Sequence, residues 1–443
     1  MSIVSAVVLL AACVPSAARQ GLRPVTTLLT ARGIDTLPLP LIDSVTTPRG
    51  LPSGPLALDS AIRLALLRSP HVRVALTDVG LAAADLWQAS RVPNPVLDLM
   101  RGFAQGGGPG VWNVGIGFSI VSALQTPLRR RIAASEMRGA EARVANAVYG
   151  AMIDVQRAYF DVQHAQQTLA LERAVATGLA ASADVAKALR SAGNVAELNV
   201  ASEEAMSMQS VADVVEAEVA LGVVRAELGR LLGAGVADTG WTIDGQLPDP
   251  APGGVALAIV DSLALARRLD VAAARERALA SAAALGLSAR FRFLADGTLG
   301  AFWEREPDGR FVGGSVSVPI PVFDGGGAPV ARARATLQQR SAEHDALVVN
   351  AHAEVRAGVA RMEGARRRAE QLRTAVLPAR RRVLQESQLQ VNAMSLPVFA
   401  LLQARQAEIE SGRMYIDALR DYWVARAELE RAAGGPLPTG RMP

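Results

Sequence analysis

Cysteine and lysine are almost absent from this 443-residue chain. Cys13 is the single cysteine, which excludes an internal disulfide and any zinc site built from several cysteines. Lys187 is the single lysine, so arginine carries nearly all of the positive charge, and the formal net charge is only +4. The arginines are interleaved with glutamates instead of clustering beside stacking aromatics. This distribution argues against a nucleic-acid partner.

Motifs for catalysis are also missing. The sequence has no HExxH, no nucleophile elbow and no phosphate-binding loop. Its four histidines lie on separate helical stretches except for His344 and His352, which are eight positions apart; we interpret them as surface or packing residues, not as metal ligands. The sequence therefore predicts a protein that is not an enzyme, with no cofactor and no resident metal.

Long apolar runs are absent, and the run at 3–12 is too short to span a bilayer. It has the length of a signal-peptide core, so we expect residues 1–18 to be an export signal, although no Lys or Arg precedes the run. Leu10-Ala11-Ala12-Cys13 resembles a lipobox, which would make Cys13 a lipidation site. An ordinary signal cleaved after Ala18 is the alternative. Residues 19–55 are expected to be irregular.

What is abundant is helical sequence, since apolar residues make up 50% of the chain and aromatics only 4%. Such a composition suits close helix–helix packing. RAELGRLLG at 225–233 nearly recurs as RAELERAAG at 426–434. Either the two stretches are ordinary helix ends, or one unit is present twice. The matching order of helix, hairpin, long helix, turn and helix favours repeats over 56–233 and 255–434, with a linker at 234–254 and a tail at 435–443.

Each repeat contains one stretch in which apolar residues alternate with small or polar ones, as in a β-strand with one apolar face. We expect hairpins at about 95–121 and 290–323, the second with a turn at 307–309 and a second strand at 315–323. The helices expected around them cover 56–92, about 128–190, 196–232, 255–289, about 328–391 and 398–433. The apolar positions predicted to face lipid are Trp112, Val114, Ile116, Phe118, Val316, Val318 and Ile320.

These strands have the length and pattern of transmembrane barrel strands, but four strands cannot close a barrel. Open edges are not tolerated in lipid, so the strands would require several copies of the chain. Three copies would supply twelve strands. The alternative from the pattern alone is a small water-soluble sheet that caps a coiled coil.

The sequence resembles the TolC family of outer-membrane efflux channels over roughly 56–434, and within it the branch that exports heavy metals and other cations. The likeness is carried by LDSAIRLALLRSPHVRVAL at 58–76, Pro93-Asn94-Pro95, VSVPIPVFDGGGAPVARARA at 316–335, LPVFALLQARQ at 396–406 and the closing RAELERAAG. The resemblance implies a mainly α fold with a small transmembrane β part. It also implies a homotrimer whose 12-stranded β-barrel would continue into a periplasmic α-helical barrel.

The resemblance also implies a passive outer-membrane conduit for metal cations or small toxic compounds. Its partners would be outer-membrane lipid, a periplasmic adaptor and an inner-membrane pump of the resistance-nodulation-division type. The adaptor-contacting tips would be Gly193, Asn194, Val195, Ser395, Leu396 and Pro397. The second tip departs from the family pattern, because Ala400 and Gln403 stand where acidic residues are usual, and Asn392-Ala393 where a glycine is usual.

Two other functions are alternatives to the channel. A soluble periplasmic coiled-coil adaptor would carry a lipoyl-like sheet domain between its helices, and the sequence has no run of short strands that would form one. A structural spacer would not need the alternating hairpins. The channel is therefore the function that the sequence favours.

Overall fold

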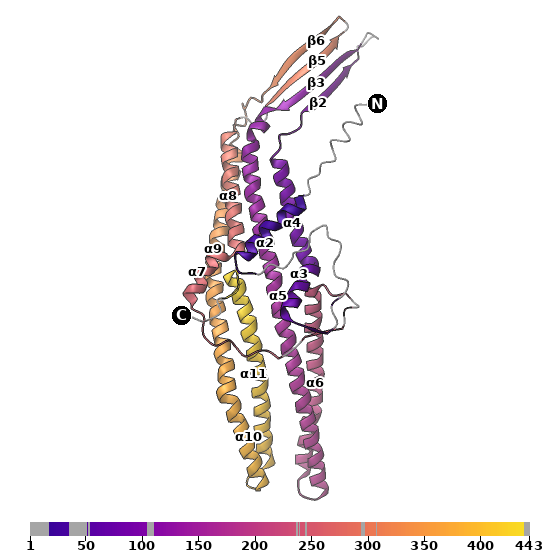
Figure 1. The fold of residues 1–443 in the computed structure, drawn as a ribbon, viewed down its shortest axis with the longest axis vertical. Coiled ribbons are helices and arrows are strands. Elements are labelled where there is room, and N and C mark those ends of the chain that lie inside the picture. Colours follow the sequence, from indigo (N-terminus) through magenta and orange to yellow (C-terminus); the bar gives the residue numbers. More distant parts are fainter. Residues whose placement is uncertain are drawn as a thin grey trace.

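The chain forms an elongated rod of helices with an antiparallel sheet at one end (Figure 1). This computed structural model describes residues 17–34, 51, 54–103, 110–235, 238, 240–243, 246–293, 297–306 and 308–437. Cys13 and most of the expected signal segment lie outside the described residues. The helices are α2 (Ala17–Thr30), α3 (Leu58–Arg68), α4 (Pro70–Ala89), α5 (Ile120–Ser191), α6 (Glu197–Leu232), α7 (Leu257–Arg267), α8 (Leu269–Arg290), α9 (Gly327–Gln371), α10 (Leu377–Asn392) and α11 (Val398–Ala433).

Six strands form two sheets in the described part of the chain. A short parallel pair joins β1 (Gly54–Leu56) to β4 (Trp241–Ile243), which lies inside the expected linker. The larger sheet contains β2 (Val96–Gly102), β3 (Val111–Ser119), β5 (Thr298–Glu306) and β6 (Gly309–Ser317) in the order β2-β3-β5-β6. The two expected hairpins therefore lie side by side in one antiparallel sheet, joined through β3 and β5.

Length is the dominant property of the helical part. Helix α5 has 72 residues, which at about 1.5 Å per residue spans roughly 108 Å. It follows β3 directly and contains Pro127 near its start, where the sequence had indicated a helix from about 128. On the other side of the rod, α9 passes through a π-helical turn at Leu372–Val376 into α10, just before Pro378. A proline inside a helix removes a backbone donor, and the wider turn accommodates it.

The helices expected over 56–92 and 255–289 are each broken in two. The first breaks at Ser69, because the following Pro70 disfavours helical backbone at the residue before it. The second breaks at Arg268, where no proline follows. There the Arg268 guanidinium is bound to the carboxylate of Asp270, 2.6 Å away, and Gly434 of α11's end lies against the break.

The prediction of an irregular segment over 19–55 is wrong for its first part, because α2 is helical to Thr30. Val25, Leu29 and Ile34 are buried in the cluster that includes Leu76 of α4 and Val148 of α5. Packing against these two helices stabilises a segment whose own sequence, with Pro24 inside it, gives little sign of a helix.

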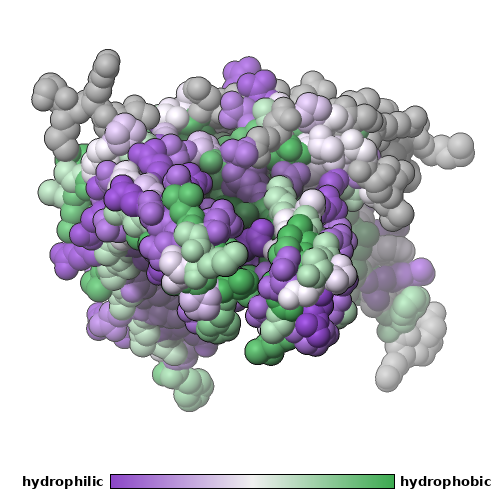
Figure 2. All heavy atoms as spheres, turned by 90° about the horizontal axis from the view of Figure 1, so that it is seen from below, coloured by the Kyte–Doolittle hydropathy of each residue, from purple (hydrophilic) through white to green (hydrophobic). Residues whose placement is uncertain are grey.

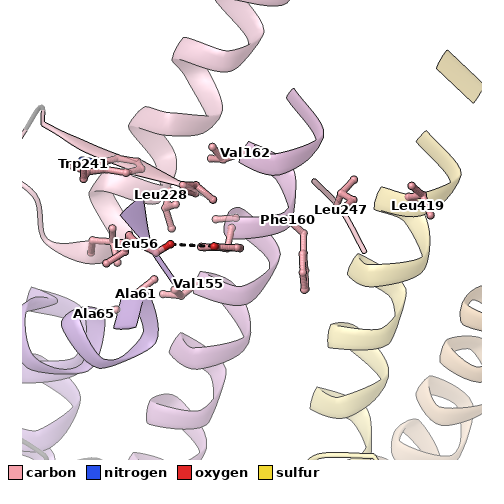
Figure 3. Close-up of a cluster of buried hydrophobic side chains, with 14 of the residues drawn as sticks. Leu56, Ala61, Ala65, Val155, Phe160, Val162, Leu228, Trp241, Leu247 and Leu419 are labelled. Atoms are coloured by element: carbon pink, nitrogen blue, oxygen red, sulfur yellow. Dashed lines mark hydrogen bonds between the residues drawn. The ribbon is translucent and has the colours of Figure 1, made fainter. Parts of the chain in front are cut away.

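The largest core cluster lies in the middle of the rod. Tyr159 of α5 donates a hydrogen bond to the carbonyl of Leu56, at 3.0 Å, and fixes the β1–β4 pair against the helices (Figure 3). Phe160 points the other way, towards Leu247 and Leu419, and stacks on Trp423 with ring centroids 5.1 Å apart. This core joins the two halves and leaves the sheet and the helical turns to project at opposite ends (Figure 1).

Candidate functional site

The strand register sorts the sheet into two chemically different faces. Directly paired residues of neighbouring strands share a face, and alternate residues of one strand lie on opposite faces. Val114 pairs with Leu99 and Trp303, and Trp303 pairs with Val312. This face is mainly apolar, apart from the row of cross-strand partners at the end of the sheet farthest from the helices. Its other rows are Leu99, Val114, Trp303 and Val312; Leu97, Ile116, Ala301 and Gly314; and Phe118, Leu299 and Val316.

The opposite face is mostly polar and small. Asp98 and Gly115 lie on it, and Asn113 pairs there with Glu304. The remaining polar or small members are Gly102, Gly117, Ser119, Thr298, Gly300, Glu306, Gly309, Gly313, Ser315 and Ser317, with Val96, Met100, Val111, Phe302 and Phe311 as the larger apolar ones. Ring atoms of Phe302 occupy the space where a side chain on Gly313 would begin, 2.7 Å from the position of its Cβ.

Five of the seven positions predicted to face lipid lie on the apolar face of a strand, namely Trp112, Val114, Ile116, Phe118 and Val316. Val318 and Ile320 do not, because β6 ends at Ser317. Pro319 and Pro321 have no N–H group and cannot continue the ladder, so the expectation that the second strand covers 315–323 is wrong. Both side chains are nonetheless exposed, Ile320 by 82%.

The sheet has no helix against either face and no partner on either edge in the described chain. The large side chains of β2 and β6 are exposed, among them Leu99 by 67% and Val312 by 82%. Strands β2 and β6 are the two ends of the strand order. A single chain therefore leaves an apolar sheet surface and two rows of backbone hydrogen-bonding groups uncovered.

The predicted tip residues lie at the other end of the rod. Gly193, Asn194 and Val195 connect α5 to α6, and Ser395, Leu396 and Pro397 connect α10 to α11. From this end, the two turns are separate protrusions with mixed hydropathy (Figure 2). The structure brings them to the same end of the molecule (Figure 1).

Both turns end the preceding helix in the same way. Gly193 has φ +78°, and the N–H of Asn194 donates to the carbonyl of Leu189 at 2.9 Å. In the second turn Met394 has φ +60°, and Ser395 N–H donates to the carbonyl of Gln390 at 2.9 Å. Methionine thus occupies a left-handed position that glycine occupies in the first turn, at an energetic cost.

A groove of about 780 Å³ separates the two helical hairpins just above these turns. Its polar lining includes Glu203, which is only 5% exposed and whose Oε2 makes no hydrogen bond, and Arg405, which donates to Ser182 at 3.2 Å. Sequence reasoning identified neither residue, because both lie on ordinary-looking amphipathic helices and become neighbours only when the hairpins pack.

Ion pairs join α11 to α5 along much of their shared length. Arg413 binds the Glu172 carboxylate through two hydrogen bonds of 2.6 Å and also reaches Asp213 of α6 at 3.2 Å. The hydrogen bond from His164 lowers the pKa of Asp417, with which it pairs at 2.8 Å. The pairs of this seam are Arg413–Glu172, His164–Asp417, Arg420–Asp161, Arg157–Glu428 and Arg431–Asp154.

The two histidines considered as metal ligands do not meet. His352 pairs with Asp261 at 2.7 Å, and His344 contacts its neighbour Asp345 at 3.2 Å. Over the residues that the structure describes, no group of three or more His, Cys, Asp or Glu side chains is arranged to hold a metal ion.

Among the described helices, none has an apolar stretch long enough to cross a lipid bilayer.

Solved structures with this architecture exist, although no protein-family model and no curated protein matches the sequence. A membrane protein from Pseudomonas aeruginosa has a TM-score of 0.74 and 21% identity, over 85% of this chain and 92% of that one. CusC, studied for folding and transmembrane channel formation, has a TM-score of 0.73 and 16% identity, over 88% and 96%. The CmeC outer-membrane channel of Campylobacter jejuni has a TM-score of 0.74 and 14% identity, over 87% of each chain. The chain therefore has the fold of outer-membrane channel proteins, the fold that its resemblance to the TolC family implies.

Proposed function

We propose that three copies of this chain form a passive channel through the outer membrane, as the exit duct of an efflux system. The observation that carries this proposal is the sheet with one apolar face, one polar face and two open edges. Strands of nine residues extend about 30 Å, and a tilt of 35–45° brings this close to the roughly 25 Å apolar band of outer-membrane barrels.

The copies can close into a ring because each contributes an even number of antiparallel strands. Four strands in antiparallel order place β2 and β6 in opposite directions, so β6 of one copy can pair antiparallel with β2 of the next. Such head-to-tail contacts close into a ring when the rotation allows it. Three copies give twelve strands with the apolar face towards lipid and the Asp98 and Asn113 face towards the lumen.

The helical part offers a second contact between copies. An apolar stripe on α6, exposed by 54% or more at each position, consists of Leu198, Met208, Val211, Val215, Val219 and Val223. Helix α6 lies on the same side of the rod as β2, whereas α9 and α10 lie on the side of β6 (Figure 1). The contact that joins β6 to the next β2 thus brings α9 and α10 against the α6 stripe. Twelve long helices would then form a periplasmic tube.

The remaining parts of the assembly are proposed from the family resemblance. The two turns, from Gly193 to Val195 and from Ser395 to Pro397, would contact a periplasmic adaptor coupled to an inner-membrane pump of the resistance-nodulation-division type. Opening of the tube would separate the turns while the packed helices slide between two arrangements.

The proposed cargo is metal cations or small toxic compounds. Besides the likeness to the cation-exporting branch, the proposed lumen carries Asp98 and Glu304, whose carboxylates favour cations. A deletion strain should become more sensitive to divalent metals than to organic dyes. Equal sensitivity to both would exclude the cation assignment and leave the channel proposal standing.

Export by a signal at 1–18 and lipidation of Cys13 are proposed from the sequence. Mass spectrometry of the mature N-terminus should find acyl chains on Cys13, and Cys13→Ser should abolish them. A mature protein that begins at Arg19 would instead support the ordinary signal.

The channel proposal is tested by thiol labelling on the two faces. Asn113→Cys places a thiol on the lumenal face and Ile116→Cys places one on the lipid face. In membranes, a charged thiol reagent should react with Asn113→Cys and not with Ile116→Cys. A water-soluble adaptor or spacer would allow both to react, since the single chain leaves Ile116 52% exposed. Membrane fractionation and a heat-sensitive trimer band in mild detergent provide the accompanying check.

A further inference from the structure

One row at the outer end of the sheet combines three arginines and a tryptophan. Arg101 pairs with Trp112, Trp112 pairs with Arg305, and Arg305 pairs with Arg310. The four residues share the apolar face, and all four are exposed. We call them the arginine row. Each of them lies one residue from an end of its strand, at the end of the sheet that is farthest from the helices (Figure 1).

These guanidinium groups have no anionic partner within the described chain. None of Arg101, Arg305 and Arg310 takes part in an ion pair there, whereas Arg173, Arg413 and Arg420 of the helical part each do. The carboxylates near the row in sequence are on Asp98, Glu304 and Glu306, which lie on the opposite face of the sheet, and on Asp308 in the turn between β5 and β6, which forms no ion pair with the row. Arg305 and Arg310 are direct cross-strand partners, an arrangement that is destabilising for like charges unless an anion lies between them.

The row is also ordered for binding. The Arg101 guanidinium lies 4.8 Å from the ring centroid of Trp112 and 4.8 Å from that of Phe103. Contacts between a cation and aromatic rings restrict the long side chain and leave its N–H groups free. Planar guanidinium groups bind phosphate oxygens through paired hydrogen bonds, which an ammonium cannot do.

The position of the row identifies the kind of phosphate. The row directly below it on the same face is Leu99, Val114, Trp303 and Val312. A ligand that contacts both rows has a phosphate beside the arginines and hydrocarbon beside the apolar row. A phosphorylated lipid in a bilayer leaflet has this arrangement. A soluble phosphate would leave the apolar rows uncovered.

We propose that the arginine row binds the phosphomonoester headgroup of membrane lipids at the outer boundary of the sheet, one site for each copy of the chain. This inference rests on the proposed membrane location of the sheet. In the assembled ring the three sites would surround the channel mouth and anchor it at a fixed depth in the bilayer.

The test uses the full-length trimer in detergent and native mass spectrometry to count bound lipid. The probes are phosphatidic acid, which has a phosphomonoester, dioleoylglycerol, which lacks it, and inorganic phosphate. Phosphatidic acid should bind in preference to dioleoylglycerol, and inorganic phosphate should not displace it. The triple variant Arg101→Gln, Arg305→Gln, Arg310→Gln should bind phosphatidic acid about a hundredfold more weakly, since each arginine near an anionic surface contributes roughly a factor of five.

The matched control removes three exposed arginines elsewhere, with Arg73→Gln, Arg91→Gln and Arg275→Gln, and should keep wild-type binding. Equal binding of phosphatidic acid and dioleoylglycerol, or an unchanged triple variant, would overturn the inference. Displacement by inorganic phosphate would overturn the assignment to a lipid. A wild-type chain that forms no membrane trimer would instead contradict the proposed function.

Discussion

The two halves of the chain contain the same order of elements, from α3 to α6 and from α7 to α11, yet they bury them very differently. Helix α5 of the first half has 24 buried residues out of 72, distributed over most of its length. Helix α9 of the second half has five out of 45. Because α5 lies between α4, α6, α8 and α11, it is central, whereas α9 and α10 have an uncovered side. Similar units therefore occupy unequal positions in one chain, and only neighbouring copies would make their surroundings equal.

The largest effect is expected at the exposed apolar stripe of α6, which only a neighbouring copy would cover. Val215→Asp with Val219→Asp puts charges into the α6 stripe and should abolish the trimer, because a charge buried between helices without a partner costs several kcal/mol. The measurement is the heat-sensitive trimer band on a mild-detergent gel.

The control for the α6 variant is Ala220→Asp, which adds a charge at an exposed position of the same helix outside the stripe. It should leave the trimer intact. A trimer that survives the double substitution would show that the α6 stripe is not the contact between copies.

A smaller effect on stability, equal in the two halves, is expected at Gly233 and Gly434, the glycines that end α6 and α11. Gly233 has φ +67° and Gly434 has φ +70°. A Cβ on Gly233 would lie 2.9 Å from the carbonyl oxygen of Arg68, and one on Gly434 would lie 2.8 Å from the backbone nitrogen of Arg268. Gly233→Ala and Gly434→Ala should each lower the free energy of unfolding by roughly 2 kcal/mol or more, from left-handed strain plus the close contact.

Denaturant unfolding, followed by the helical circular dichroism signal, measures this loss. Gly80→Ala, in the middle of α4 with open space around it, should instead be neutral or stabilising. If only one of the two closing glycines is sensitive, the two halves do not close in the same way.

The halves also differ in charge at matching positions, since Glu430 in RAELE stands where the first half has Gly229. Burial raises the pKa of Glu430, and Arg426 offsets this only in part. A carboxyl with a raised pKa in the folded state binds more protons there than in the unfolded chain. Its contribution to stability therefore falls as pH rises from about 4.5, its ordinary value, through its folded pKa.

Replacing Glu430 by Gln should remove this pH dependence. Urea midpoints measured between pH 4 and pH 7 should decline more steeply for wild type than for Glu430→Gln in that window. Parallel curves would mean that Arg426 fully compensates the buried carboxylate.

The smallest effect is expected at the two turns. Met394→Gly relieves left-handed strain and should raise the free energy of unfolding by up to about 1 kcal/mol, while Gly193→Met should lower it by about the same amount. Thermal unfolding of the two single variants and of the double exchange measures both changes. Two changes of the same sign would contradict the equivalence of the turns.

Several elements could be predicted from local pattern alone. The last helix, expected over 398–433, is α11 at Val398–Ala433, because its apolar period and its glycine stop are contained in consecutive residues. The alternation around Trp112 to Phe118 likewise predicted β3. At 315–323 the same alternation predicted a strand that is too long. The strand ends at Ser317, because Pro319 and Pro321 cannot donate backbone hydrogen bonds to a neighbouring strand.

The sequence by itself determined the class of the fold, the long helices, the turns between them and the chemical asymmetry of the strands, since periodicity and turn residues act over a few neighbouring positions. Only the tertiary structure decided that α2 is helical, that a break falls at Arg268 and that Glu172, Asp213 and Arg413 form one cluster. The arginine row belongs to this second group, because its members are up to 209 positions apart and meet only through strand register (310 − 101 = 209). Contacts between distant segments depend on how whole elements pack, which no local pattern contains.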